Sequence, residues 1–350
     1  MKPLLGCSMG DPAGIGPEVL LRAASQVRGD GQAAGCLFLG DATVFATYAG
    51  ALPGIEPPTI VESAEQARAS LANGQPGPFL LECARVPSGF TPGTPRREDS
   101  AAALAAVMSG AQFAAAGDVD ALVTAPLSKH GVAAHVPGFK GHTEFLAALD
   151  GASHPIMLFA GPRDTEITTP DIALLTTHLP LVTAIAAVQP AAVESAIVRL
   201  HGAWAAQFGR EPVIGIAALN PHAGEFGAIG GEEARVLAPA IRAAAAEGID
   251  VRGPFPADSC FLRQELDVIL ALYHDQGTIM AKRAPWPTVN LTLGLSYIRT
   301  SPDHGTAYDL AGSGRADHAP TLAAMNLASR LAGRLGNGYE TAGNDATDVA

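Results

Sequence analysis

The sequence is poor in charged and aromatic residues. Only 16% of its 350 residues are charged and 5% are aromatic, whereas 48% are hydrophobic. A disordered chain needs the opposite balance, so disorder of the whole chain is excluded. The formal net charge of −12 would repel a phosphate backbone, and no run of lysine or arginine offsets that repulsion. Nucleic acid is therefore not an expected partner.

Cysteine is scarce, and long apolar runs are missing. The four cysteines lie far apart and form no Cys-x-x-Cys pair, so neither a disulfide framework nor a sulfur-ligated metal site is expected. No apolar run approaches the roughly 20 residues of a membrane-spanning helix, and the N-terminal apolar stretch is too short for a signal peptide. These observations favour a cytoplasmic location and no membrane partner.

The chain alternates between short apolar runs and alanine-rich stretches with helical spacing. This alternation predicts an α/β fold with a mostly parallel sheet. Strands are expected at 4–9, 34–39, 119–124, 172–176, 213–219 and 268–273, and helices at 17–24, 42–49, 101–116, 181–201 and 231–246.

The length is about twice that of one domain, so two lobes are expected, with the functional site in the cleft between them. Residues 336–350 lack apolar periodicity and are expected to form a disordered tail.

Three histidines stand directly after predicted strands: His178, His222 and His274. In parallel α/β sheets the carboxyl ends of the strands carry ligands, because their loops converge on one crevice. A lone histidine at such a place is more often a hydrogen-bonded structural residue, but three similar placements favour a metal site. Imidazole suits zinc, cobalt and similar ions, whereas magnesium prefers oxygen. Three protein ligands would leave positions open for a substrate.

Two irregular segments contain many glycines and small residues. Gly10–Glu18 leads from the first strand into a helix, but it is not the GxGxxG fingerprint of the dinucleotide fold, so a Rossmann domain of the usual kind is not expected. Thr300–Gly312 gathers small residues and hydrogen-bond donors. Such a loop can wrap an adenosine, and a plain surface loop is the alternative.

Candidate anion-binding residues lie at two places. Lys282, Asn290 and Arg299 supply two cations and an amide, which suit a carboxylate or a phosphate. His142 and Thr143 follow a glycine, where they either bind phosphate or cap the helix that comes next. Cations are few in this acidic protein, so the grouping is more informative than it would be in a basic one.

Together the motifs resemble the 4-hydroxythreonine-4-phosphate dehydrogenase family of vitamin B6 biosynthesis, in order and over nearly the whole chain. They read GDPAGIGPE, TAPLSK, GHTEF, TTHLPL, LNPHAGE, YHDQG, VNLTLGL and IRTSPDHGTAYDLAG. The resemblance implies the two-lobed α/β fold of isocitrate and isopropylmalate dehydrogenases. It also implies a homodimer that completes each active site, and use of NAD or NADP.

The resemblance assigns roles residue by residue. It implies that His178, His222 and His274 bind one divalent metal, zinc, cobalt or magnesium, with one of the three reaching across the dimer interface. It implies substrate contacts from His142, Thr143, Lys282, Asn290 and Arg299, and cofactor contacts from Gly14, Gly16, His304, Gly305 and Asp309. The lobes are expected to comprise residues 1–130 plus 270–335 on the cofactor side, and residues 131–269 on the metal and dimerisation side.

The implied reaction is oxidation of 4-(phosphooxy)-threonine to 2-amino-3-oxo-4-(phosphooxy)butanoate, which loses CO₂ to give 3-amino-2-oxopropyl phosphate. A bound divalent ion would lower the pKa of the substrate hydroxyl and polarise the developing carbonyl. A base must still take the hydroxyl proton. Asp275, Asp258, Asp303 and Lys129 are the candidates, and the sequence does not rank them.

Three other functions stay open. The stretch 278–287 departs from the family pattern just before and after Lys282, which leaves room for a related dehydrogenase of phosphorylated threonate or erythronate. A metal-dependent hydrolase could use the same three histidines, but it leaves the two glycine-containing segments without a role. A phosphometabolite-binding protein would need the cations but not the histidines.

Overall fold

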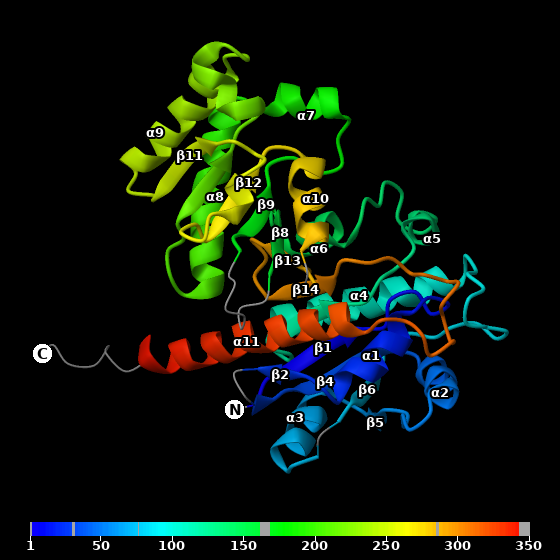
Figure 1. The fold of residues 1–350 in the computed structure, drawn as a ribbon. Helices are drawn as coiled ribbons and strands as arrows, with labels where there is room; N and C mark the ends of the chain where they lie inside the picture. Colours follow the sequence, from blue (N-terminus) through cyan, green and yellow to red (C-terminus); the bar gives the residue numbers. More distant parts are fainter. Residues whose placement is uncertain (1, 30–31, 76, 162–168, 285–286, 343–350) are drawn as a thin grey trace, which may run out of the picture. The chain divides into compact units, whose positions relative to one another are not determined.

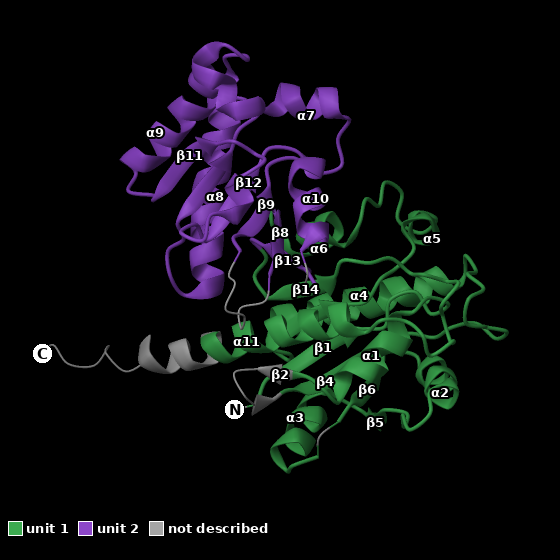
Figure 2. Ribbon diagram, in the orientation of Figure 1, with its two compact units in different colours: residues 1–153, 295–350 green, residues 154–294 purple. Residues whose placement is uncertain are grey.

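The computed structural model describes residues 2–29, 32–75, 77–161, 169–284 and 287–342 (Figure 1). The chain forms two compact units (Figure 2). Unit 1 comprises residues 1–153 and 295–350, and unit 2 comprises residues 154–294. The boundaries thus differ from those expected, because 131–153 belongs to unit 1 and 270–294 to unit 2. The roles given to the two lobes stay predictions.

Unit 1 is built on a parallel sheet. Its strands lie in the order β14-β7-β1-β4-β6-β5, and all the neighbouring pairs within this unit are parallel. They are β1 (Leu4–Ser8), β4 (Gly35–Gly40), β5 (Thr59–Val61), β6 (Phe79–Glu82), β7 (Ala121–Thr124) and β14 (Arg299–Pro302), with a short hairpin of β2 (Arg28–Gly29) and β3 (Gln32–Ala33). Every residue of β1 and β4 is buried, as expected for central strands covered on both faces.

Helices cover the sheet of unit 1. They are α1 (Gly16–Ala24), α2 (Ala42–Ala51), α3 (Ala64–Ala72), α4 (Asp99–Ala116), α5 (Lys129–Ala133), α6 (His142–Asp150) and α11 (Ala319–Ala342). Helix α4 lies directly on the strands because its buried face carries mostly alanine and glycine: a methyl group at Gly110 would meet Leu122 at 2.6 Å. Helix α2 begins where Asp41 accepts hydrogen bonds from the backbone of Thr43 and of Val86.

Unit 2 has a mixed sheet in the order β11-β10-β12-β9-β8-β13. The first four strands are parallel, and β8 pairs antiparallel with both of its neighbours in this unit. The strands are β8 (Ile156–Ala160), β9 (Asp171–Leu174), β10 (Ile214–Ala217), β11 (Val251–Phe255), β12 (Val268–Ala271) and β13 (Val289–Leu293). The helical segments are α7 (Leu181–Ala187), α8 (Pro190–Phe208), η1 (Pro221–Gly227), η2 (Glu233–Leu237), α9 (Ala238–Ala246), η3 (Cys260–Leu262) and α10 (His274–Arg283).

The expected α/β class with a mostly parallel sheet is confirmed, and two details differ. The single helix expected at 181–201 is two helices, α7 and α8, which meet at a bend of 84°. Pro190 explains the break, because it has no backbone N–H to donate and is favourable only in the first turn of a helix. Helix α11 continues through residues 336–342 of the expected tail, and residues 343–350 lie outside the described part of the chain.

Within the described residues, no single helix has both the length and the apolar composition of a membrane span. The bent pair α7 and α8 passes that test only when its two helices are taken together.

Candidate active site

The carboxyl ends of three neighbouring strands in unit 2 carry the candidate metal ligands. Strands β10, β12 and β9 are adjacent and parallel, so their carboxyl ends lie at one edge of the sheet. His178 follows β9, His222 follows β10 within η1, and His274 is the first residue of α10 after β12. The placement of each histidine after a strand is therefore as the sequence indicates.

Two of these histidines lie close together. The ring centroids of His178 and His274 are 5.6 Å apart, with the rings tilted by 42°. Nδ1 of His274 lies 2.7 Å from Oδ1 of Asp275 and 3.5 Å from Oγ1 of Thr278. A carboxylate on one ring nitrogen fixes the ring and leaves the other nitrogen for a ligand, which is the usual arrangement around metal-binding histidines.

His222 lies in an unusual backbone turn. Residues 222–226 all have positive φ, and four of these five are not glycine. Left-handed conformations of such residues cost about 1–3 kcal/mol each and persist only where the surroundings enforce them. Here Glu233, which is 7% exposed, accepts hydrogen bonds from the backbone of Leu219 and Asn220 and from the Asn220 side chain. Glu233 therefore fixes the segment that presents His222.

The three histidines do not form a complete metal site in one chain. Among the described residues, no group of three or more histidine, cysteine, aspartate or glutamate side chains is arranged to hold a metal ion. The pair His178 and His274 is brought together, and His222 is exposed elsewhere on the loops of the same unit.

The other unit 2 candidates lie on α10, β13 and a loop. Lys282 is exposed in the last turn of α10, and Asp258 is exposed in the loop before η3. Asn290 lies in β13, where its Oδ1 is buried and accepts no hydrogen bond within the described residues. A buried polar atom of this kind is a candidate for ligand binding, because leaving it unsatisfied costs free energy. Pro285 and Trp286, in the stretch that departs from the family pattern, lie outside the described residues.

Unit 1 brings several of its candidates together in a partly buried basic cluster. Arg299 is 2% exposed, donates to Thr124 Oγ1 at 2.7 Å, and has its pKa lowered by burial to about 10. Burial, followed by the charges of Arg299 and Lys129, lowers the pKa of His142 well below 6.5. Nε2 of His142 is buried and has no hydrogen-bond partner among the described residues. The cluster thus holds two cations, a neutral imidazole and the Glu144 carboxylate, and its surplus of donors suits an anionic ligand.

The same cluster includes the first turn of α6. Thr143 is 7% exposed and is the second residue of this helix. A methyl group at Gly141 would come within 3.8 Å of Lys129 Nζ, so the lysine ammonium lies over the start of the helix. Backbone N–H groups at a helix start and a nearby ammonium both favour a negatively charged ligand.

The two glycine-containing segments of unit 1 are bound to each other. Ile15 N donates to Thr306 O at 2.9 Å, and Tyr308 donates to Asp11 at 2.7 Å. The glycines expected to contact a cofactor permit this packing: a methyl group at Gly14 would meet Thr306 O at 2.9 Å. Gly16 is packed against the Met9 carbonyl in the same way. His304, Gly305 and Asp309 lie in the second segment, which is partly exposed.

Sequence reasoning missed the acidic side chains that hold these loops. Glu18, fully buried, accepts from the backbone of Gly312 at 2.9 Å and of Ala316 at 3.1 Å. Asp11 is 3% exposed, and burial raises its pKa although Tyr308 and the Ala13 backbone donate to it. Both carboxylates belong to the first motif, but their partners lie almost 300 residues away in the sequence, so local patterns could not reveal them.

The chain is similar to proteins of one family over almost its whole length. A family model described as pyridoxal phosphate biosynthetic protein PdxA matches residues 32–328. The 4-hydroxythreonine-4-phosphate dehydrogenase of Janthinobacterium sp. (strain Marseille) is 39% identical over 344 residues, which cover 95% of this chain and 97% of that protein.

Solved structures agree. The 4-hydroxythreonine-4-phosphate dehydrogenase from Klebsiella pneumoniae superposes with a TM-score of 0.79 at 30% identity, covering 95% of this chain and 98% of that one. A terephthalate 1,2-cis-dihydrodioldehydrogenase from Burkholderia xenovorans LB400 superposes with a TM-score of 0.63 at 30% identity, covering 94% and 98%. These neighbours confirm the expected fold class, and each is named as a dehydrogenase.

Proposed function

This chain belongs to the PdxA family of pyridoxal phosphate biosynthetic proteins, and we propose that it oxidises 4-(phosphooxy)-threonine with NAD or NADP. Its relatives are dehydrogenases, so the family is one of oxidoreductases and implies a nicotinamide cofactor and a metal. The proposed product, 2-amino-3-oxo-4-(phosphooxy)butanoate, would lose CO₂ to give 3-amino-2-oxopropyl phosphate.

The main support for a phosphorylated acid as the substrate is the basic cluster of unit 1. Arg299 is buried, Lys129 and His142 supply further donors near it, and the Glu144 carboxylate also acts on Arg299. We assign the substrate's phosphate or carboxylate to His142, Thr143 and Arg299. Lys282 and Asn290 of unit 2 are also proposed to contact the substrate. The Oδ1 atom of Asn290, which has no hydrogen-bond partner among the described residues, can accept from an amine or a hydroxyl.

The histidines of unit 2 suit a divalent metal by the chemistry of their donors. His178 and His274 offer imidazoles on neighbouring loops, and Asp275 occupies the second nitrogen of His274. When bound there, the cation would supply Lewis acidity toward the substrate hydroxyl. We propose that the third histidine comes from a second copy of the chain, which accounts for the incomplete set in one copy.

A homodimer is part of this proposal. The surface of unit 2 bears apolar side chains around α7: Leu179, Leu181, Val182 and Ile185 are 47%, 55%, 82% and 44% exposed. A contiguous apolar surface of this kind is typical of an interface. The proposal predicts a dimer by light scattering and activity that falls on dilution. Mixing a metal-ligand variant with a Lys282 variant should restore some activity if the two residues reach one site from different chains.

The proton acceptor is proposed among three residues. Asp275 has one oxygen engaged by His274, Asp258 is exposed on its loop, and Lys129 lies in the basic cluster. Asp303, also considered from the sequence, lies just after β14 in unit 1. The pH dependence of kcat in single variants would identify the base, since only its loss should remove the corresponding limb of the profile.

The direct test is a substrate panel with the metal-loaded protein. We expect dinucleotide reduction with 4-(phosphooxy)-threonine to exceed that with 4-phosphoerythronate or 4-phosphothreonate, for either NAD or NADP. Faster turnover of the latter two would favour the related dehydrogenase, a possibility raised by the departure around Lys282. Release of inorganic phosphate without dinucleotide reduction would instead identify a hydrolase.

A further inference from the structure

Unit 1 contains a cavity of about 660 Å³ that lies beside both glycine-containing segments. Asp11 of the first segment and Tyr308 of the second form part of its wall, and the rest comes from the start of α4 and from α5. Its polar lining residues are Asp11, Arg96, Arg97, Ser100, Ser128, His130 and Tyr308. None of the roles assigned above uses Arg97, His130 or the two serines.

The carboxylates in and behind the wall of this cavity already have partners within unit 1. Arg96 forms a two-bond ion pair with Asp99, which is fully buried, and also donates to the carbonyls of Pro87 and Ser88. Asp11 accepts from Tyr308 and from the Ala13 backbone. A ligand therefore does not have to displace an ion pair in order to enter.

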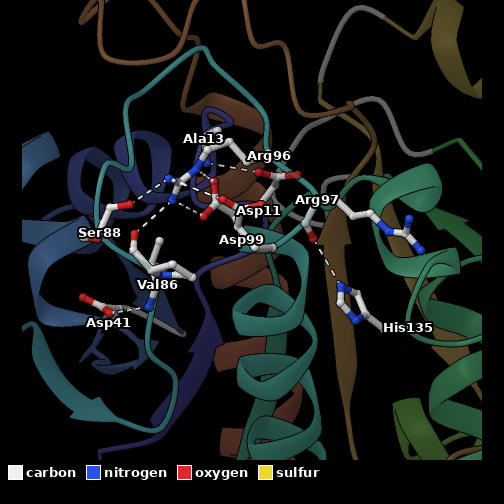
Figure 3. A network of polar contacts seen from close by, with 11 residues as sticks. Asp11, Ala13, Asp41, Val86, Ser88, Arg96, Arg97, Asp99 and His135 are labelled. Carbon is white, nitrogen blue, oxygen red and sulfur yellow. Dashed lines mark hydrogen bonds and ion pairs between the residues drawn. The ribbon is translucent and has the colours of Figure 1, made fainter.

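Arg97, unlike Arg96, has a guanidinium that is not engaged by the described neighbouring groups. Its carbonyl accepts from His135, but within the described part of the chain its guanidinium makes no hydrogen bond or ion pair. Figure 3 shows this side chain pointing away from the Arg96–Asp99 pair. His130, in the first turn of α5, is exposed, also lines the cavity, and likewise makes no such contact among the described residues.

We infer that this cavity is a phosphate-binding pocket in which Arg97, His130 and the hydroxyls of Ser100 and Ser128 hold a phosphate group of the nicotinamide dinucleotide. This inference rests on the proposed function, because it takes the dinucleotide as the occupant. A guanidinium with unused donors and two hydroxyls match the oxygens of a phosphate. The cavity is also large enough for a nucleotide fragment.

The position of the cavity favours the dinucleotide over the substrate. Its walls include Asp11 and Tyr308, which join the two segments expected on the cofactor side. The residues assigned to the substrate, His142, Thr143 and Arg299, do not line it. An arginine near the ribose is a common means of accepting the 2′-phosphate that distinguishes NADP from NAD.

The test compares Arg97→Gln with the wild-type holoenzyme. Dissociation constants for NADP, NAD and inorganic pyrophosphate are measured by calorimetry, together with KM for the phosphorylated substrate. We expect dinucleotide binding to weaken about 10- to 100-fold, the range for losing a charge-assisted contact to phosphate. Arg97→Lys keeps the charge but loses the planar guanidinium, so its affinity for the dinucleotide should lie between those of the wild type and Arg97→Gln. Arg85→Gln, an exposed arginine outside the cavity, is the matched control and should bind as the wild type does.

The pattern of affinity losses shows which phosphate group occupies the pocket. A loss for NADP alone places the 2′-phosphate in the pocket, and an equal loss for NADP, NAD and pyrophosphate places the diphosphate there. Unchanged binding of all three would overturn the inference and leave the proposed oxidation intact. A rise confined to substrate KM would also overturn it, because the phosphate would then be the substrate's. Wild-type protein that binds neither dinucleotide would contradict both this inference and the proposed function. Thermal unfolding confirms that each variant is folded.

Discussion

The two units present their candidate residues in opposite ways. In unit 1 Arg299, Thr143 and the Nε2 atom of His142 are buried, although Lys129 is exposed. Elsewhere in this unit, the buried carboxylate of Glu18 fixes the backbone at Gly312 and Ala316. In unit 2 His178, His222, Lys282 and Asp258 are exposed, whereas His274 is partly covered and Asn290 has its Oδ1 buried. Unit 1 is therefore organised before any ligand arrives, whereas unit 2 offers donors that still need a metal ion or a second copy of the chain.

This difference affects how much of the binding free energy is lost in ordering the binding residues of each unit. Arg299 is already buried and held in place before a ligand binds, so an anion that contacts it loses little of the interaction free energy to ordering. Exposed donors must be ordered when the metal or partner binds, and part of the interaction is lost in ordering them. Variants in unit 2 should therefore change the metal content and the assembly of the protein. Variants in unit 1 should change the affinity for the substrate and the free energy of unfolding.

The largest effect is expected from the exposed histidines. His222→Ala should remove the metal and reduce turnover by more than the roughly 100-fold typical of losing an outer-shell partner, because a ligand itself is lost. The fold should survive, since the core does not depend on a metal. Metal content by elemental analysis, kcat, and circular dichroism measure the three quantities. Full metal content with normal turnover would show that His222 is not a ligand.

The next prediction compares one cation from each unit. Arg299→Met and Lys282→Met should each raise KM for the phosphorylated substrate by about one to two orders of magnitude, from the loss of a charge-assisted contact. Only Arg299→Met should also lower the free energy of unfolding, because it leaves Thr124 without its buried donor. Steady-state kinetics and denaturant unfolding separate the two effects. Equal stability losses in both variants would contradict the contrast between a buried and an exposed site.

The sequence predicted the strand ends better than the loops. Apolar runs and alanine-rich stretches identified the strands before His178, His222 and His274, because burial on both faces leaves a clear local pattern. The break at Pro190 was readable in principle from the missing N–H donor, but the helical spacing on both sides concealed it.

Other features have no local signal at all. The left-handed turn at 222–226 depends on Glu233, which lies in a different helical segment and acts through the backbone of Leu219 and Asn220. The junction of Asp11 with Tyr308 joins residues 297 positions apart. Such contacts depend on the tertiary fold, so the residues could be singled out as a motif while their partners could not.

A smaller effect is expected where unit 1 begins one of its helices. Asp41→Ala removes the acceptor for both Thr43 N and Val86 N, at a site that is 5% exposed. We expect a loss of about 1–2 kcal/mol in the free energy of unfolding, the upper range for an N-cap. Ser63→Ala is the matched control, because Ser63 caps α3 through one exposed bond, to Gln66 N. Urea unfolding of both variants should rank Asp41 above Ser63, and the reverse order would show that the second bond does not stabilise unit 1.

The smallest effect is a pH dependence of the free energy of unfolding that arises from His142 in unit 1. The pKa of His142 is lowered well below 6.5, first by burial and then by Arg299 and Lys129. Below pH 6.5 the unfolded chain takes up a proton at this position while the folded protein does not, so the stability associated with neutral His142 falls as pH drops from 6.5 toward the folded-state pKa. Between pH 7 and 5.5 the wild type should lose about 1 kcal/mol more than His142→Gln, which has no proton to gain. All other groups are the same in the two proteins, so their contributions cancel in the difference. Equal pH dependence in the two proteins, measured by denaturant unfolding at both pH values, would mean that His142 is protonated as readily in the folded cluster as in the unfolded chain, and that the cluster accepts a third positive charge without cost.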